Sequence, residues 1–272
     1  MITEPAIQKT YRPSRTRQVK LLLNNLKNTS FGVPRFLLTN NPSKTLPIFA
    51  KRVGFSFWRA NMEKPLMTPE GFMLYTNMDL LVYTCIFIEH NLYYKPFIQD
   101  LKYQLDHFNI IDVGANVGLF SQWIGSYNPC GTFNCIELWD ENIRRGLKIN
   151  KELPMVWHNN AAHHTSNKIL EFNIGDSVTL IDTPNIVKKQ LITSITVDYI
   201  AEFKKDIFAL KIDTDGNNIN VLDGALKTLP KTKWLLIEHE PGVKAWIVAE
   251  APYFKLMKWT SPDDMIWRNT TL

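Results

Sequence analysis

The stretch Ile110-Ile111-Asp112-Val113-Gly114-Ala115-Asn116-Val117-Gly118-Leu119-Phe120 decides the fold that we expect for this chain. Apolar residues and an aspartate lead into two glycines that stand four residues apart, and beyond them the apolar residues recur at helical spacing. This pattern predicts a strand, a tight turn and a helix. Glycines at such a turn let backbone N–H groups approach a ligand that a Cβ atom would keep away. The stretch therefore predicts a nucleotide-type binding pocket.

The turn departs from the fingerprint of dinucleotide-binding proteins. In G-x-G-x-x-G a pyrophosphate sits on the helix N-terminus, whereas Asn116 stands here where the middle glycine would fall. A cofactor without a phosphate, held by its amino-acid and ribose groups, tolerates the added bulk and the polar amide better. We therefore expect S-adenosylmethionine rather than NAD, with a turn that binds no ligand as the alternative.

Strand and helix patterns alternate along the chain beyond residue 95. We expect strands at 110–114, 132–137, 155–161, 169–174, 191–197, 208–213 and 234–238, and helices at 96–108, 119–127, 141–153 and 219–229. This alternation predicts an α/β fold with a mostly parallel sheet and helices on both faces. Strands at 253–259 and 265–269 can form a C-terminal antiparallel hairpin at the sheet edge.

Positive charge is concentrated at the N-terminus. Residues 1–60 contain eleven Lys and Arg and one acid, whereas the remainder contains twenty Lys and Arg and twenty-five Asp and Glu. The basic residues within 9–59 favour either a surface for an anionic partner such as nucleic acid, or a solvated arm that packs on an acidic body or another subunit. We expect a basic extension and substrate-side cap at 1–95, and a cofactor-binding domain at 96–272.

The composition is that of an ordinary globular protein. No segment resembles a signal peptide, and the longest apolar run, at 80–88, is too short to span a bilayer. The three cysteines lack the spacing of a zinc site, which favours reduced structural thiols. We expect a cytoplasmic protein.

Polar residues follow the predicted strands at the edge where ligands bind in parallel sheets. Glu137 comes nineteen residues after Gly118, which is the spacing of an acid that accepts hydrogen bonds from ribose hydroxyls. Asn160 and Ala161, after the next strand, would lie near an adenine ring, with a plain turn as the alternative.

Two further strands end in groups that can move a proton. Asp213 and Asp215 lie on the same side of the extended chain, so one can hold an amine while the other acts as a base, unless either caps the next helix. His239 stands between Glu238 and Glu240 and could supply a base opposite Asp213. Although such oxygen-rich side chains suit Mg²⁺ or Mn²⁺, no spacing rule singles out a metal site, and we expect none.

The residues resemble the FkbM family of S-adenosylmethionine-dependent methyltransferases. The matching segments are IIDVGANVGLFS at 110–121, Glu137 with Asn142 and Asn150, the segment 196–198, ALKIDTDGNNINVLDGAL at 209–226 and LLIEHE at 235–240. The resemblance covers the chain from about residue 70 to its end. It implies a class I, Rossmann-like methyltransferase fold and methyl transfer to an oxygen or nitrogen of a natural product, sugar or peptide.

Two departures from the family pattern lie in the site. The chain has Asp215 where the family usually has Glu, and Leu138 where a Pro commonly follows the strand-ending acid. The cofactor contacts that we expect are Asp112, Gly114, Ala115, Asn116, Gly118, Glu137, Leu138, Asn160, Ala161 and Asp213, and the catalytic residues are Asp213, Asp215 and His239. The alternatives are an RNA methyltransferase that uses the basic arm, and a non-catalytic partner-binding module with the same fold.

Overall fold

The computed structural model describes residues 95–104, 106–149, 153–174, 188–259 and 264–272, and the backbone of three short strands. Two of these strands, β1 (Leu66–Met67) and β2 (Met73–Leu74), pair antiparallel. The basic residues within 9–59 lie outside the described residues, as does most of the predicted cap. The division of the chain near residue 95 therefore stays a prediction.

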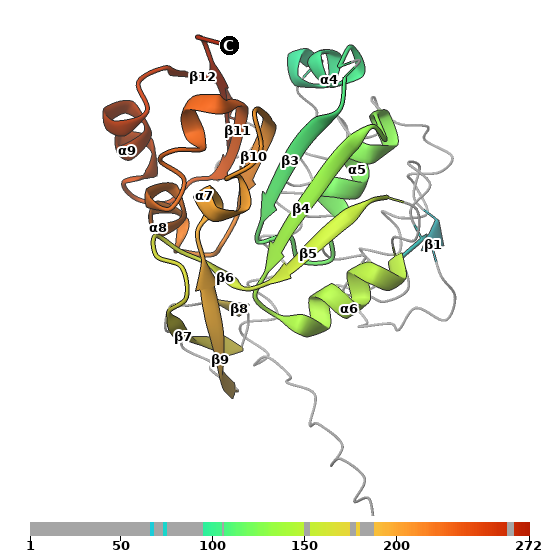
Figure 1. The fold of residues 1–272 in the computed structure, drawn as a ribbon, viewed down its shortest axis with the longest axis vertical. Coiled ribbons are helices and arrows are strands. Elements are labelled where there is room, and N and C mark those ends of the chain that lie inside the picture. The colour runs from blue at the N-terminus through green and yellow to red at the C-terminus, as the bar shows by residue number, and fades with distance from the viewer. Residues whose placement is uncertain are drawn as a thin grey trace, which may run out of the picture.

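A seven-stranded sheet forms the centre of the molecule, in the order β12-β13-β11-β10-β3-β4-β5 (Figure 1). Its strands are β3 (Phe108–Val113), β4 (Gly131–Glu137), β5 (Met155–Asn159), β10 (Ile207–Ile212), β11 (Thr232–Glu238), β12 (Phe254–Trp259) and β13 (Asp264–Asn269). The five strands from β5 to β11 are parallel, and β13 runs antiparallel to both of its neighbours. The strand order reverses between β3 and β10, which is where open α/β sheets bind their ligands.

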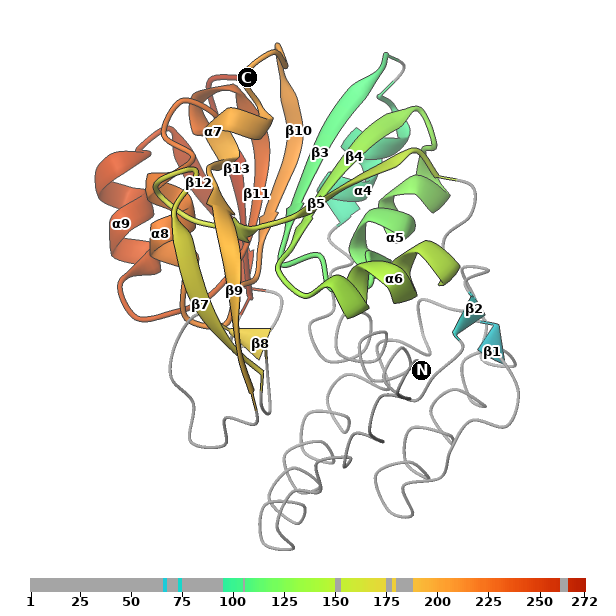
Figure 2. The same ribbon diagram turned by 60° about the horizontal axis from the view of Figure 1, so that its bottom comes forward.

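Helices cover both faces of this sheet (Figure 2). They are α4 (Lys95–Lys102), α5 (Leu119–Tyr127), α6 (Asp140–Ile149), α7 (Val197–Ile200), α8 (Asn218–Asp223) and α9 (Val243–Glu250). The first three lie on one face and the last three on the other. Because strand side chains alternate between faces, Ile110 packs in the core under α4 and α5, whereas Ile111 packs in the core under α8 and α9.

A smaller sheet with the order β6-β9-β7-β8 extends beside the main one. Its strands are β6 (Ala161–Ala162), β7 (Ile169–Ile174), β8 (Val178–Thr179) and β9 (Lys188–Ile195). The strand expected at 155–161 is therefore divided between two sheets, because β5 ends at Asn159 and Ala161 pairs with Ser194 of β9. The chain leaves the main sheet at this point.

The structure confirms the predicted architecture, which is the class I, Rossmann-like sheet with a C-terminal hairpin. The hairpin of β12 and β13 contributes one antiparallel strand, since β13 is inserted between β11 and β12. The helix expected at 119–127 has these bounds. In the described part of the chain, no helix is long and apolar enough to cross a membrane.

Several predicted bounds were wrong. The helix expected at 96–108 ends at Lys102, and the one expected at 219–229 ends at Asp223. The residue after the second helix, Gly224, lies against the backbone of His163, where any Cβ would overlap the carbonyl oxygen. The strand predicted to reach Val197 stops at Ile195, because the Thr196 side chain accepts a hydrogen bond from the amide of Tyr199 and begins α7. Helix α9 was not predicted.

Phe97 of α4 anchors the aromatic part of the core. Its ring centroid lies 6.2 Å from that of Trp123, 5.8 Å from Phe208 and 5.6 Å from Trp234. Phe97→Ala should lower the free energy of unfolding by about 3–5 kcal/mol, because a cavity replaces these contacts. Urea unfolding followed by circular dichroism measures the change. Tyr103→Ala is the matched control, because Tyr103 is 79% exposed on the same segment. Equal losses in the two variants would contradict this packing.

Candidate functional site

The turn between β3 and α5 is held between two neighbouring strands. Gly114, Asn116 and Gly118 have φ values of +68°, +52° and +73°. The amides of Gly114 and Ala115 donate to the carbonyl oxygen of Ile136 on β4, at 3.0 and 3.1 Å. On the other side, a Cβ added at Gly114 would overlap the carbonyl oxygen of Asp213, which follows β10. Only glycine fits at position 114, as the sequence pattern predicts.

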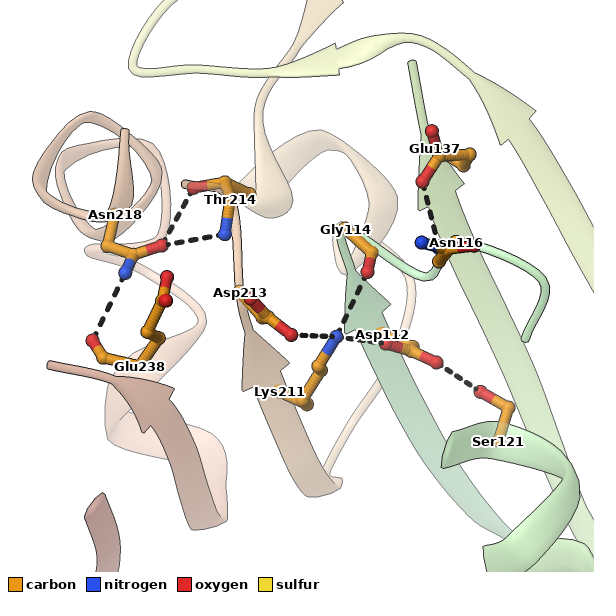
Figure 3. Close-up of polar contacts among 10 residues, drawn as sticks. All are labelled: Asp112, Gly114, Asn116, Ser121, Glu137, Lys211, Asp213, Thr214, Asn218 and Glu238. Carbon is orange, nitrogen blue, oxygen red and sulfur yellow. Dashed lines mark hydrogen bonds and ion pairs between the residues drawn. The ribbon is translucent and has the colours of Figure 1, made fainter. Parts of the chain in front are cut away.

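Glu137 at the end of β4 is bonded to this turn (Figure 3). Its Oε2 accepts a hydrogen bond from the amide of Asn116 at 2.8 Å, and its Oε1 accepts from the amide of Trp139 at 2.9 Å. The Asn142 side-chain amide lies 3.4 Å from the same Oε1. Burial raises the pKa of Glu137 to about 7, although the hydrogen bonds from Trp139 and Asn116 oppose the shift. The predicted turn and the predicted acid therefore form one unit.

The residues expected near an adenine ring lie beside Glu137, at the end of β5. Asn159 pairs with Glu137 in the β4–β5 register, and its side chain donates to the carbonyl oxygens of Glu137 and Leu138 at 3.2 and 3.1 Å. Asn160 donates instead to the carbonyl oxygen of Thr193 at 3.0 Å, and Ala161 is buried. Asn159, which was not predicted, thus supports the backbone around the strand-ending acid.

Lys211 of β10 is a central residue that the sequence analysis missed. Its Nζ lies 3.4 Å from Oδ1 of Asp112, 3.2 Å from Oδ2 of Asp213 and 3.0 Å from the carbonyl oxygen of Gly114 (Figure 3). Burial alone would lower the pKa of Lys211, but the charges of Asp213 and Asp112 outweigh it and raise this pKa above its ordinary value. The available signal was a lysine inside an apolar strand, where a buried cation requires partners.

Asp112 lies beneath the turn and is fully buried. Its Oδ2 accepts a hydrogen bond from the hydroxyl of Ser121 on α5 at 2.9 Å. Burial raises the pKa of Asp112, and the charge of Lys211 opposes this shift. Asp112 thus acts on the turn through its ion pair with Lys211, and its predicted contact with the cofactor stays a prediction.

Acidic side chains gather where β10 and β11 end. Burial raises the pKa of Glu238 to about 8, and the charges of Asp213, Asp215 and Glu240 add to the shift. Although Asp215 lies at the surface, neighbouring protein atoms remove part of its hydration. This desolvation, with the charges of Asp213 and Glu240, raises the pKa of Asp215 to about 6. The structure thus brings Asp213 and Asp215 together, and it adds Glu238.

Glu240 caps the start of α8. Its carboxylate accepts hydrogen bonds from the amides of Gly216 and Asn218, the second at 3.2 Å. The Asn218 side chain accepts from the amide and hydroxyl of Thr214 at 3.1 and 2.7 Å, and donates to the carbonyl oxygen of Glu238 at 3.1 Å. These bonds hold the turn after β10 against the end of β11, and the capping role expected of an aspartate falls to Glu240.

The structure places His239 close enough to Glu240 for its charge to oppose the raised pKa of that carboxyl, but the His239 ring turns toward β12. The ring of His239 packs edge-on against Trp259 of β12, with 5.1 Å between the ring centroids. Because β13 lies between β11 and β12, this contact directs His239 away from β10. Glu238, the residue before it, is the β11 side chain whose charge acts together with Asp213 and Asp215.

Two buried polar atoms lie near the turn and the acidic group. Oδ1 of Asn116 and Oε2 of Glu238 form no hydrogen bond with any described residue. Such atoms normally have partners, and an amine would suit both. Within the described ranges, no three His, Cys, Asp or Glu side chains are arranged to hold a metal ion.

Comparisons with known proteins find similarity in structure alone. No protein-family model and no curated protein matches the sequence. TrmK of M. capricolum, solved with S-adenosylhomocysteine, is 8% identical, with 63% of this chain and 67% of that chain covered and a TM-score of 0.37. The precorrin-6y C5,15-methyltransferase of Geobacter metallireducens is 11% identical, with 64% and 85% covered and a TM-score of 0.39. Similarity this low assigns no substrate, and the FkbM resemblance stays a prediction.

The raised pKa of Glu238 predicts how stability depends on pH. Between about pH 4.5 and pH 8 the folded protein keeps a proton on Glu238 that the unfolded chain releases, so this group contributes less stability as pH rises. Glu238→Gln removes this titration. The melting temperature of the variant should rise relative to wild type from about pH 5 to about pH 8.5. Glu202→Gln, at an exposed position, should show no such trend. A pH-independent difference for Glu238→Gln would contradict the assignment.

Proposed function

We propose that this protein is an S-adenosylmethionine-dependent methyltransferase that acts on an oxygen or nitrogen of a natural product, sugar or peptide. The observation that supports it best is the bond of 2.8 Å between Glu137 and the amide of Asn116. This bond joins the glycine turn after β3 to the acid after β4, beside the point where the strand order reverses. In open α/β sheets, a nucleoside with a charged amino-acid tail suits this position.

The residues present fit this cofactor. Oδ1 of Asn116, in the turn at 114–118, forms no hydrogen bond with a described residue and can accept one from an amine. Glu137 can accept from ribose hydroxyls through the lone pairs that its present bonds leave free. Leu138, Asn160 and Ala161 are the candidates for the adenine side. The cofactor would supply an activated methyl group on a sulfonium, which needs little further activation.

The protein's own tasks are then to orient the acceptor and to remove its proton. Asp213 is held by Lys211 at 3.2 Å and can orient a hydroxyl or amine. Asp215, with a pKa of about 6, is mostly ionised near neutral pH and can accept a proton on its carboxylate. When the acceptor atom can attack without first losing a proton, holding it in line with the methyl group contributes more to the rate than a base does. His239 stays a prediction as a catalytic residue.

Charge at the edge of the sheet favours this acceptor class over RNA. Asp213, Asp215 and Glu240 would repel the phosphates of a nucleic acid that approached the end of β10. The basic residues that suggest RNA lie within 9–59, outside the described structure. RNA binding that weakens steeply with salt, together with methylation of that RNA, would reverse this preference.

Calorimetric titration with S-adenosylhomocysteine tests the cofactor. Wild type should bind, and Glu137→Gln should bind at least about tenfold more weakly, because its amide NH₂ would face one of the two donor amides, that of Asn116 or that of Trp139. Since the ionised carboxylate accepts the ribose hydrogen bonds, affinity should rise between about pH 6 and pH 8 in wild type only. Glu141→Gln, on the surface of α6, is the control. Absence of binding to wild type would overturn the proposed function.

Turnover tests the acceptor side. With an acceptor found by screening natural products, sugars and peptides, Asp215→Asn should lower kcat by about a hundredfold or more, because it removes the base. Its affinity for S-adenosylhomocysteine should stay within about twofold of wild type, since Asp215 lies outside the turn at 114–118. Asp206→Asn, at an exposed position before β10, is the control. Unchanged turnover in Asp215→Asn would remove Asp215 from the mechanism.

A further inference from the structure

The ammonium group of Lys211 joins three separate segments of the chain. It contacts a carboxylate on β3, a backbone carbonyl in the turn and a carboxylate after β10, which belong to Asp112, Gly114 and Asp213. A lysine ammonium carries three N–H donors, and each can meet one of these oxygens. The side chain of Lys211 is only 12% exposed, so these contacts are largely shielded from water.

Lys211 bonds to the peptide group between Gly114 and Ala115, which also bonds to β4 on its opposite side. The carbonyl oxygen of Gly114 accepts from Lys211 at 3.0 Å, and the N–H of the same peptide, which belongs to Ala115, donates to Ile136 at 3.1 Å. The first peptide of the turn is therefore fixed between β10 and β4. Because a peptide group is planar, these two bonds act on one rigid unit, and the amide of Asn116 in the next peptide donates to Glu137.

We infer that Lys211 is a positioning residue that fixes the turn at 114–118 and holds Asp213 beside it, so that one cation aligns the cofactor side with the acceptor side. This inference rests on the proposed function. Lys211 itself lies below the edge of the sheet and acts through Gly114 and Asp213. A hydrogen bond from a charged donor to a shielded carbonyl is strong enough to order a turn that contains three positive φ angles.

A simpler role would make Lys211 only the counterion of Asp112. A fully buried carboxylate needs a cation or several hydrogen bonds, and Ser121 supplies only one. Under that role, the effect of removing Lys211 would disappear once Asp112 is neutral. Under the positioning role, the effect would persist, because the contacts with Gly114 and Asp213 are still lost.

A double-mutant cycle separates the two roles. The proteins are wild type, Lys211→Met, Asp112→Asn and the double variant, in which no carboxylate at 112 is left buried without its partner. Amide hydrogen exchange by NMR is measured on ligand-free protein at Asn116 and Gly118, with Trp267 of β13 as the reference. Melting temperatures and calorimetric affinity for S-adenosylhomocysteine are measured on the same samples.

The positioning role predicts a local effect in both backgrounds. Relative to Asp112→Asn, the double variant should exchange Asn116 and Gly118 about tenfold faster and bind S-adenosylhomocysteine about tenfold more weakly, with Trp267 unchanged. Equal exchange and affinity in these two proteins would overturn the inference and leave Lys211 as a counterion. Because exchange needs no ligand, it decides the role of Lys211 at the turn even if wild type fails to bind S-adenosylhomocysteine, a result that would refute the proposed function separately.

Discussion

The contact between the ends of β3 and β10 is the constraint on which the rest of the site depends. Gly114 lies so close to the carbonyl oxygen of Asp213 that no side chain fits between them, and Lys211 bonds to both residues. The turn of one strand and the carboxylates of the next are thereby held at fixed separation. This is also where the strand order reverses, so the tightest backbone contact of the site coincides with the position at which an open sheet can admit a ligand.

Electrostatics divides the edge of the sheet into two parts. Around the turn, Asp112 and Lys211 neutralise each other in the interior, and Glu137 is satisfied mainly by backbone amides. At the ends of β10 and β11, Asp215 and Glu238 have raised pKa values because burial and like charges act in the same direction. The first part is suited to holding a ligand in one position, and the second to exchanging protons near neutral pH.

Local sequence patterns predicted the bounds of the elements next to the turn more accurately than the bounds of elements farther along the chain. The helix at 119–127 and the strand ending at Glu137 follow from hydrophobic period and glycine placement, which act over a few residues. The helix expected at 219–229 was too long, since α8 ends at Asp223 and the next residue, Gly224, packs against His163, some sixty residues away in sequence. The strand expected at 155–161 was divided for a similar reason, since Ala161 pairs with β9.

The sequence by itself determined the α/β class, the mostly parallel sheet, the glycine turn and the acid that follows β4, because each depends on residue types at short spacing. Only the tertiary structure decided that Lys211 lies among three oxygens, that Glu240 caps α8 and that Glu238 rather than His239 faces Asp213. These contacts join residues far apart in sequence. Strand order and register bring them together, and no local pattern along the chain encodes which partner a buried charge will meet.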